Sequence, residues 1–309
     1  MADAREQMVD TLRGRILRGI HSGTLVPGDR MPTSREVAAE FEVDYRLAIV
    51  AYKELQREGL VELRPRGGVY ISQRAAGSLG IPPLPQPWLV DVFAAGLARE
   101  IPAPELSGWL QRCLGTLRLR ATAVASTHDQ LMGLSRELRD DFGLEVDGLL
   151  ASDARADGVA APALRRADLI ITTETHAHWA RALAAEIGKT VIVVEVSPEL
   201  LGGEWAILLR RPVYVVVASP TFADMVHDFY AHVRGIENLH VIVFGRDDLS
   251  AIPEGAATYV TQQVRTQLGQ TRVPGRILPA ARTLSSESAR EIFAFIVRSN
   301  IQAMSRLAR

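Results

Sequence analysis

The sequence predicts a small helical domain that ends in a β-hairpin, followed by a larger α/β domain with a mainly parallel sheet. Two patterns predict this order. Apolar residues recur at helical spacing through the first sixty residues, whereas short β-branched runs alternate with amphipathic segments beyond residue 116. Between them, residues 77–87 read GSLGIPPLPQP, and so much proline and glycine is typical of a linker. We therefore divide the 309 residues into segments 1–76, 77–87 and 88–309.

The composition is ordinary for a globular chain, with 47% hydrophobic and 23% charged residues. The formal net charge is −1, so any nucleic acid would have to be bound by a local basic patch. The single cysteine, Cys113, excludes internal disulfides and multi-cysteine metal sites, and it fits a reducing compartment. The sequence has neither a signal peptide nor a run of about 18 apolar residues. We therefore expect a cytoplasmic protein with no membrane partner.

Three helices are predicted in the first segment. Residues 9–20 carry apolar residues at helical spacing, Thr33 or Ser34 can cap a second helix, and Asp44 caps a third helix that Gly59 closes. Two strands, at residues 60–63 and 69–72, then flank a basic turn of sequence RPRGG. Two helices joined by a short turn and followed by a hairpin with a basic tip are typical of a winged helix-turn-helix domain.

The amino-acid sequence of this segment is more specific than the order of its predicted helices and strands. The stretches LRGRILRGIHSGTLVPGDRMPTSREVAAEF and AYKELQREGLVELRPRGGVYIS closely resemble the DNA-binding domain of the GntR family of bacterial transcription regulators. The residues that carry the resemblance are Leu12, Arg13, Ile16, Gly19, Gly23, Leu25, Pro27, Gly28, Pro32, Arg35, Glu36, Ala38, Val43, Ala51, Leu55, Glu58, Gly59, Leu60, Gly67 and Gly68. The resemblance covers residues 8–72. Many family members have Ser-Arg-x-Thr where this chain has Asp44-Tyr45-Arg46-Leu47, so the base sequence that they read does not carry over.

Basic and polar side chains gather where such a domain would contact DNA. Helix N-termini and cationic side chains contact phosphates, and the start of the recognition helix reaches base edges. The predicted DNA-binding residues are Thr33, Ser34, Arg35, Tyr45, Arg46, Lys53, Arg64, Arg66 and Gly67. One winged domain buries too little surface for tight specific binding. We therefore expect a homodimer on double-stranded operator DNA.

Eight predicted strands alternate with helices in the second segment. Apolar runs such as VIVVEV and VYVVVAS suit strands that are covered on both faces, which favours a parallel sheet. The strands are predicted at 117–125, 146–151, 168–172, 190–196, 213–218, 239–244, 257–260 and 275–279, and the helices at 128–142, 174–187, 199–210, 221–234, 261–268 and 285–307. They could form one large sheet or two lobes, as in periplasmic-binding-protein-like sensor domains. We favour two lobes.

Ligands of open α/β sheets bind at the carboxyl ends of the strands. Hydroxyl side chains follow several predicted strands directly and precede helix starts, where they can hold a polar or anionic small molecule without a metal. The predicted ligand-binding residues are Ser126, Thr127, Thr172, Thr173, Ser197, Ser219, Thr221 and Arg246, the last as a partner for a carboxylate or phosphate. The alternative is that the hydroxyls only cap helices and that Arg246 is solvated.

The sequence offers little for catalysis. It contains no GxSxG nucleophile elbow. The histidine pairs, His176 with His178 and His227 with His232, lack the i, i+4 spacing that helical metal sites usually use. We therefore predict no catalytic residue, no metal and no cofactor.

Two apolar stretches are candidates for a dimer surface. Residues 88–114 predict two helices interrupted by Pro102 and Pro104, which could instead pack on the sensor as core, and residues 289–307 predict a final helix. Together these features predict a homodimeric transcription regulator controlled by a small-molecule effector in its second domain. The alternatives are a regulator whose second domain is a ligand-free dimerisation or protein-interaction module and, ranked last, an α/β enzyme fused to a DNA-binding module.

Overall fold

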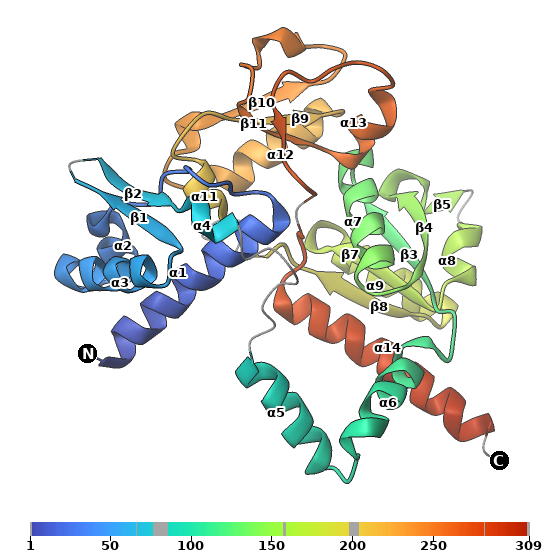
Figure 1. The fold of residues 1–309 in the computed structure, drawn as a ribbon. Coiled ribbons are helices and arrows are strands. Elements are labelled where there is room, and N and C mark those ends of the chain that lie inside the picture. Colours follow the sequence, from blue (N-terminus) through green and yellow to red (C-terminus); the bar gives the residue numbers. More distant parts are fainter. Residues whose placement is uncertain are drawn as a thin grey trace.

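The computed structural model describes residues 2–65, 67–76, 86–156, 159–197, 204–280 and 282–307. They form an N-terminal domain, two α/β lobes and a helical hairpin (Figure 1). We call the sheet of residues 120–194 with the helices that cover it, including the one at residues 286–307, lobe 1, and residues 204–277 lobe 2.

The N-terminal domain is the predicted winged helix-turn-helix. Its elements are α1 (Ala2–Ser22), α2 (Ser34–Glu40), α3 (Tyr45–Arg57), the antiparallel strands β1 (Val61–Arg64) and β2 (Gly68–Ile71), and α4 (Gln73–Ala76). Tyr52 of α3 is fully buried in the core of this domain, and its hydroxyl donates to the carbonyl of Pro32 at 2.6 Å. This bond ties the recognition helix to the turn that precedes α2.

Lobe 1 is a four-stranded parallel sheet. Its strands are β3 (Arg120–Ala125), β4 (Glu145–Leu150), β7 (Leu169–Thr173) and β8 (Thr190–Val194), in the order β4-β3-β7-β8. The helices α7 (His128–Asp140) and α14 (Ser286–Leu307) pack on one face, and α8 (Pro162–Arg166) and α9 (Ala177–Ile187) pack on the other. The short hairpin of β5 (Arg155–Ala156) and β6 (Val159–Ala160) was not predicted. Cover on both faces explains the near-continuous apolar strands.

Lobe 2 repeats this strand order. Its strands are β9 (Val213–Val217), β10 (Leu239–Val243), β11 (Ala257–Val260) and β12 (Arg276–Ile277), in the parallel order β10-β9-β11-β12. The helices α11 (Glu204–Leu208) and α12 (Pro220–Tyr230) pack on one face, and α13 (Gln262–Gln267) packs on the other. All eight predicted strands therefore occur, and they form two sheets rather than one.

The chain crosses between the lobes twice, and the two crossings pair with each other. Val196 and Leu284 form an antiparallel bridge, flanked by a hydrogen bond from the Ser197 amide to the Thr283 carbonyl at 2.7 Å. After the second crossing, α14 returns to lobe 1. Paired crossings of this kind are a place where one lobe can rotate relative to the other.

A helical hairpin follows the predicted linker. Residues 77–85 of that linker lie outside the described residues, and α5 (Gln86–Leu97) begins within its predicted end. The second helix, α6 (Ala103–Gly115), packs on α14, where the Asn300 side chain accepts a hydrogen bond from the Leu117 amide at 2.6 Å. The hairpin thus belongs to the lobe 1 side of the molecule, as Figure 1 shows.

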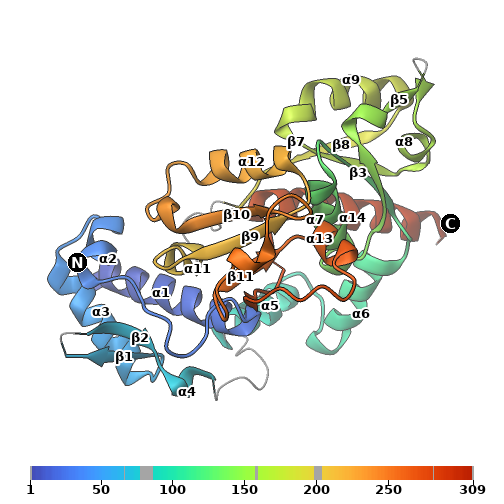
Figure 2. The ribbon, with the colours of Figure 1, turned by 90° about the horizontal axis from the view of Figure 1, so that it is seen from above.

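The N-terminal domain lies against lobe 2. Helix α1 contacts α11, and buried residues of the domain and of lobe 2 form one continuous apolar cluster. Figure 2 shows α1 beside α11, with lobe 1 on the far side of lobe 2.

Candidate DNA interface and inter-lobe cavity

The recognition helix α3 presents its first residues to solvent. The Asp44 carboxylate caps the helix by accepting a hydrogen bond from the Arg46 amide at 2.8 Å. Tyr45 and Arg46 consequently begin the helix with exposed side chains, and Lys53 is exposed two turns later. This end of a recognition helix is the part that reaches base edges in the major groove.

Helix α2 begins with the predicted capping box. The Thr33 amide donates to the Glu36 carboxylate at 2.7 Å, and the Glu36 amide donates to the Thr33 hydroxyl at 3.3 Å. Ser34 is half-buried and Arg35 is exposed at this helix start. The N-terminus of α2 can therefore contact a phosphate through backbone amides with Arg35 beside it.

Arg64 lies near the tip of the wing, in the last residue pair before the turn. The Arg64 guanidinium lies over the Tyr70 ring at 4.2 Å, and the Gly67 amide donates to the Arg64 carbonyl at 2.9 Å to close the turn. Arg66 lies outside the described residues. Arg30, which the sequence reasoning missed, is exposed and lies beside Gly68 at the same hairpin. Its position between two turn prolines was the only signal in the sequence.

Glu36 also contacts lobe 2. Its carboxylate accepts from the Arg210 guanidinium at 2.5 Å, and Arg234 lies at 3.7 Å. Burial by itself would raise the pKa of Glu36, but hydrogen bonds from Arg210 and Thr33 outweigh it and lower the pKa to about 2. The residue that completes the cap of α2 is thereby also an ion-pair partner of the second domain.

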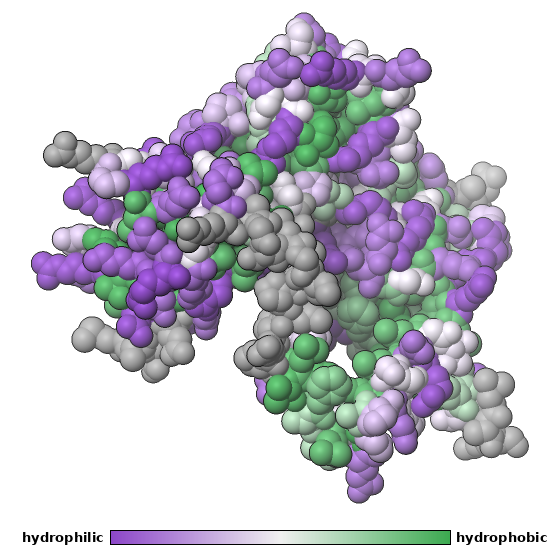
Figure 3. Space-filling view, in the orientation of Figure 1, coloured by the Kyte–Doolittle hydropathy of each residue, from purple (hydrophilic) through white to green (hydrophobic). Residues whose placement is uncertain are grey.

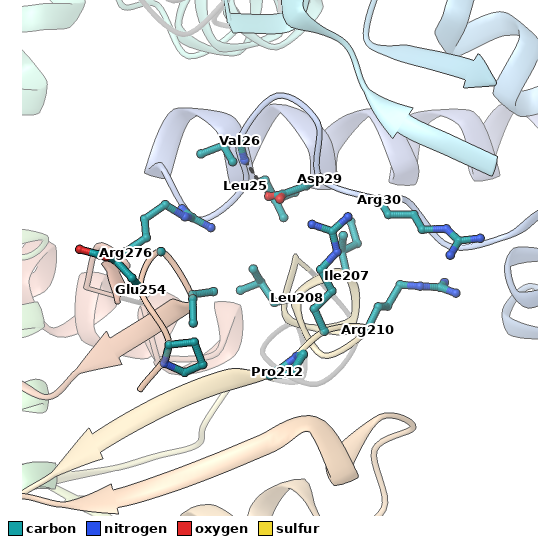
Figure 4. Close-up of a pocket in the computed structure, with 15 residues that line it drawn as sticks. Leu25, Val26, Asp29, Arg30, Ile207, Leu208, Arg210, Pro212, Glu254 and Arg276 are labelled. Carbon is teal, nitrogen blue, oxygen red and sulfur yellow. Dashed lines mark hydrogen bonds between the residues drawn. The ribbon is translucent and has the colours of Figure 1, made fainter. Parts of the chain in front are cut away.

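A cleft of about 540 Å³ is lined by residues of both the N-terminal domain and lobe 2. Figure 4 shows Leu25 and Val26 on one side, and Ile207 and Leu208 of the α11 segment opposite them. At one end of this cleft the Arg276 guanidinium donates to the Gly23 carbonyl at 3.1 Å. Apolar packing and charged contacts thus join the two parts.

A second cavity, of about 240 Å³, lies between the two lobes. Residues at the carboxyl ends of the lobe 1 strands, including Ala125, Thr173 and Val194, line one side, and α11, α12 and β11 of lobe 2 line the other. Of the eight predicted ligand-binding residues, all of which are described, Thr173 lines this cavity. The cavity occupies the edge of the sheets where ligands of α/β proteins bind.

Several of the other predicted ligand residues are bonded to nearby backbone. The Thr127 hydroxyl accepts from the Gln130 amide at 3.3 Å and caps α7, and the Ser219 hydroxyl caps α12 in the same way. Thr172 is buried and donates to the Val124 carbonyl at 3.0 Å. Short hydroxyl side chains of this kind satisfy local backbone groups first.

The remaining predicted ligand residues lie in different surroundings. Ser197 is buried in the first crossing, and Thr221 is exposed on α12. The Arg246 side chain is 61% exposed and pairs with the neighbouring Asp247 at 3.0 Å. The structure therefore does not bring the predicted set together in one place, and a ligand role for these residues stays a prediction.

Two buried carboxylates that sequence reasoning missed hold α7 in place. The Asp129 carboxylate accepts from the amides of Ala218 and Ser219 at 3.0 and 2.9 Å and from the Thr261 hydroxyl at 2.5 Å. Glu137, on the same helix, accepts from the backbone of the second crossing. Both are only 3% exposed. Asp129 therefore joins lobe 1 to the strand ends of lobe 2, and acidic residues within a helix gave no sequence signal of this.

Ser126 and His176 form a hydrogen-bonded pair. The tautomer of His176 decides whether the histidine could activate the serine as a nucleophile. The Trp179 indole, which can only donate, bonds the His176 Nδ1 at 3.3 Å, so the proton of a neutral ring is on Nε2. Burial lowers the pKa of His176, which favours this neutral form. Nε2 lies 2.8 Å from the Ser126 hydroxyl and therefore donates to it. A histidine that donates to serine cannot act as its general base in this arrangement.

Family comparison identifies the N-terminal domain. Residues 8–71 match the family described as "Bacterial regulatory proteins, gntR family". Residues 8–71 form a GntR-family winged helix-turn-helix domain. The resemblance drawn from the sequence is thereby confirmed, and we refer to these residues as the GntR domain.

Curated relatives match the same part of the chain. The HTH-type transcriptional regulator Rv1152 of Mycobacterium tuberculosis is 37% identical over 70 residues, which are 23% of this chain and 58% of that protein. The HTH-type transcriptional repressor YtrA of Bacillus subtilis is 36% identical over 74 residues, which are 24% of this chain and 54% of that protein. The chain thus spans little more than half the length of these relatives.

A solved structure, a GntR family transcriptional regulator from Listeria monocytogenes, covers 35% of this chain and 92% of its own, with 20% identity and a TM-score of 0.29.

Among the residues that the structure describes, no helix is both long and apolar enough to cross a membrane. Within the same residues, no group of three histidine, cysteine, aspartate or glutamate side chains is placed to hold a metal ion.

Proposed function

We propose that this chain regulates transcription by binding operator DNA as a homodimer through its GntR domain, under the control of a small molecule that binds between the two lobes. The curated relatives named as transcriptional regulators support the DNA-binding part. The exposed Tyr45, Arg46 and Lys53 on α3 support it further, because these side chains are free to enter a major groove.

The observation that carries the regulatory part is the position of α11. Trp205 of this helix lines the inter-lobe cavity, whereas Ile207 and Leu208, two and three residues further on, line the cleft that Leu25 of the GntR domain also lines. A ligand that changes the position of Trp205 therefore acts on a segment that also contacts the GntR domain. A ligand alters DNA affinity only through its differential affinity for the two arrangements, and α11 is the element that would couple them.

The exposed apolar surface of the helical hairpin supports a homodimer. Figure 3 shows hydrophobic atoms gathered over α5. The large apolar side chains exposed on α5 and α6 are Trp88, Val90, Phe93, Leu97, Trp109, Leu110 and Leu114. Contiguous apolar surface of this extent usually marks an interaction site. A second copy would cover it with the same surface, as two-fold symmetry requires.

The DNA-binding proposal is tested by selecting duplexes from a random pool with the full chain. We expect enrichment of a two-part sequence with pseudo-palindromic half-sites, because a symmetric dimer reads symmetric DNA. Fluorescence anisotropy at fixed salt should then show an affinity at least about 10³-fold higher for the selected duplex than for a scrambled one. A pool that shows no enrichment would overturn the proposal.

A ligand-free interaction module remains the second candidate for the α/β domain. The cavity between the lobes favours the ligand-binding reading, because side chains of a purely structural interface fill such spaces to the packing density of a protein interior.

A further inference from the structure

The walls of the inter-lobe cavity are strongly aromatic. Trp205, Phe222, Phe229, Tyr230 and Tyr259 line it, and they come from α11, α12 and β11 of lobe 2. Trp205 lies with its ring centroid 5.8 Å from that of Tyr230 and 5.9 Å from that of Tyr259. Burial raises the pKa of Tyr230, so its ring carries a neutral hydroxyl. Such a wall binds apolar molecules and also attracts cations to the ring faces.

The charged residues that line the cavity are acidic. The lining residues, all described, include the carboxylates Asp129 and Glu195 and contain no lysine, arginine or histidine. Asp129 already accepts three hydrogen bonds from lobe 2, whereas Glu195 is exposed at the end of β8, where the first crossing begins. An anionic ligand would face like charge without a cationic partner, which is costly away from water. This lining opposes the anionic class expected from the strand-end hydroxyls.

The size of the cavity limits the ligand. An apolar cavity of about 150 Å³ holds one benzene molecule. The inter-lobe cavity, at about 240 Å³, has room for one ring with a short substituent or for a fused pair of rings.

We propose that the inter-lobe cavity binds a hydrophobic organic cation, with an aromatic or alkyl body among the rings of lobe 2 and an amine or quaternary ammonium group toward Glu195. This inference rests on the proposed function, because it names the chemical class of the effector. The ligand would contact both lobes and Trp205 of α11, which is the segment that reaches the GntR domain.

Three matched probes test the charge preference on the full chain. These are 4-phenylbutylamine, 4-phenylbutanol and 4-phenylbutanoate, which share one hydrophobic body and differ in charge. Isothermal titration calorimetry should give the amine an affinity about tenfold higher than that of the alcohol, as expected for one ion pair with cation–π contact. The carboxylate should not bind measurably. Equal affinity for amine and alcohol, or tighter binding of the carboxylate, would overturn the proposal.

Variants locate the site. Glu195→Gln should lower the amine affinity several-fold, because it removes the ion pair and leaves the cation–π contact, and it should leave alcohol binding unchanged. Glu254→Gln is the control, because Glu254 is 81% exposed and lines the other cleft. Unchanged amine binding in Glu195→Gln would contradict the assignment of the cation to this carboxylate.

Gly133 offers a way to fill the cavity. It lies on α7, lines the cavity, and has no atom within 4 Å of the position where a Cβ would stand. Gly133→Leu should therefore abolish amine binding without loss of folding, since leucine also favours helix more than glycine does. Gly133→Ala, which adds one methyl group, should retain binding. If Gly133→Leu is folded by circular dichroism and binds the amine normally, the cavity is not the site.

Measuring the affinity for a selected duplex with and without the amine separates the two proposals. If no probe binds while the duplex is bound specifically, the ligand inference fails and the DNA-binding proposal stands. If the amine binds as described but leaves DNA affinity unchanged, the inference stands and the proposed ligand control fails.

Discussion

The two lobes share one strand order but have different neighbours. The sheet of lobe 1 is covered by α14, on which the α5–α6 hairpin packs, whereas lobe 2 is joined through α11 to the GntR domain. The cavity between them is equally asymmetric, because its aromatic rings come from lobe 2 and both of its carboxylates from lobe 1 and the first crossing. The two lobes therefore share a topology but make different contacts. Lobe 1 holds the proposed dimer surface, and lobe 2 holds the DNA-binding domain.

This division has a mechanical consequence. If two copies associate through the hairpins on lobe 1, the separation of the two GntR domains depends on how each lobe 2 is oriented relative to its lobe 1. A ligand between the lobes can then change the spacing of two recognition helices, which must match half-sites about one helical turn of DNA apart.

The largest expected effect is on the oligomeric state, when charges are placed on the helical hairpin that packs on lobe 1. Leu110→Glu together with Leu114→Glu places two charges on the exposed apolar face of α6, where the side chains are 52% and 46% exposed. We expect sedimentation at micromolar concentration to change from a species of twice 33.8 kDa to a monomer, with the fold intact because neither residue is buried. Glu100→Ala, in the exposed loop between α5 and α6, is the control. A variant that stays dimeric would remove the hairpin as the dimer surface.

The next effect breaks the link between the lobes. Asp129→Ala leaves the amides of Ala218 and Ser219 and the Thr261 hydroxyl without their acceptor. Each unsatisfied buried donor costs about 1 kcal/mol or more, so we expect unfolding to become easier by about 3 kcal/mol. Urea denaturation measures this change. Asp147→Ala, at a partly exposed carboxylate of lobe 1 that lies 3.8 Å from Arg166, serves as the control. A loss below about 1 kcal/mol would show that Asp129 does not hold the lobes together.

The third effect concerns how DNA is read. Arg46→Ala should cost about 1–3 kcal/mol of binding to the selected duplex and relax base preference, because Arg46 begins the recognition helix. Arg64→Ala, at the wing, should weaken binding to specific and scrambled duplexes alike, as loss of a phosphate contact does. Isotherms on both duplexes at fixed salt separate the two patterns. The assigned surface would be incorrect if neither variant changed affinity.

These residues also show where sequence reasoning succeeds. The Thr33–Glu36 capping box, the Asp44 cap and the eight strands follow from local patterns, since each depends on neighbours a few residues away. The family resemblance then supplied the DNA-binding assignment, which no single pattern could have given.

The cavity and the domain contact could not be predicted in this way. Trp205, Tyr230 and Tyr259 belong to three separate elements and meet only when the chain folds. The Arg210–Glu36 contact likewise joins residues far apart in sequence. The hydroxyls at strand ends are predicted to bind a ligand because their pattern is visible locally in the sequence. In the structure, the hydroxyls of Thr127 and Ser219 cap helices.

The smallest expected effect is on the free energy of unfolding, through the ion pair between Glu36 and Arg210 of lobe 2. The folded-state pKa of Glu36 is about 2, below its ordinary value of 4.5, because hydrogen bonds from Arg210 and Thr33 outweigh the effect of burial. A lowered pKa stabilises the folded protein above the ordinary value, and this stabilisation is lost as the pH falls from 4.5 toward 2. Arg210→Gln should therefore lower the free energy of unfolding by less than about 1 kcal/mol at pH 7, as for a partly exposed ion pair.

The same variant should reduce the pH dependence between pH 5 and 3, since the Glu36 pKa then returns toward its ordinary value. Arg234→Gln is the matched control, because Arg234 is 82% exposed and lies 3.7 Å from the same carboxylate. Urea denaturation across this pH range should distinguish Arg210→Gln from both the control and the parent chain. If all three profiles coincide, the ion pair does not hold the GntR domain on lobe 2, and the apolar contact through α11 and the hydrogen bonds from Arg276 must do so.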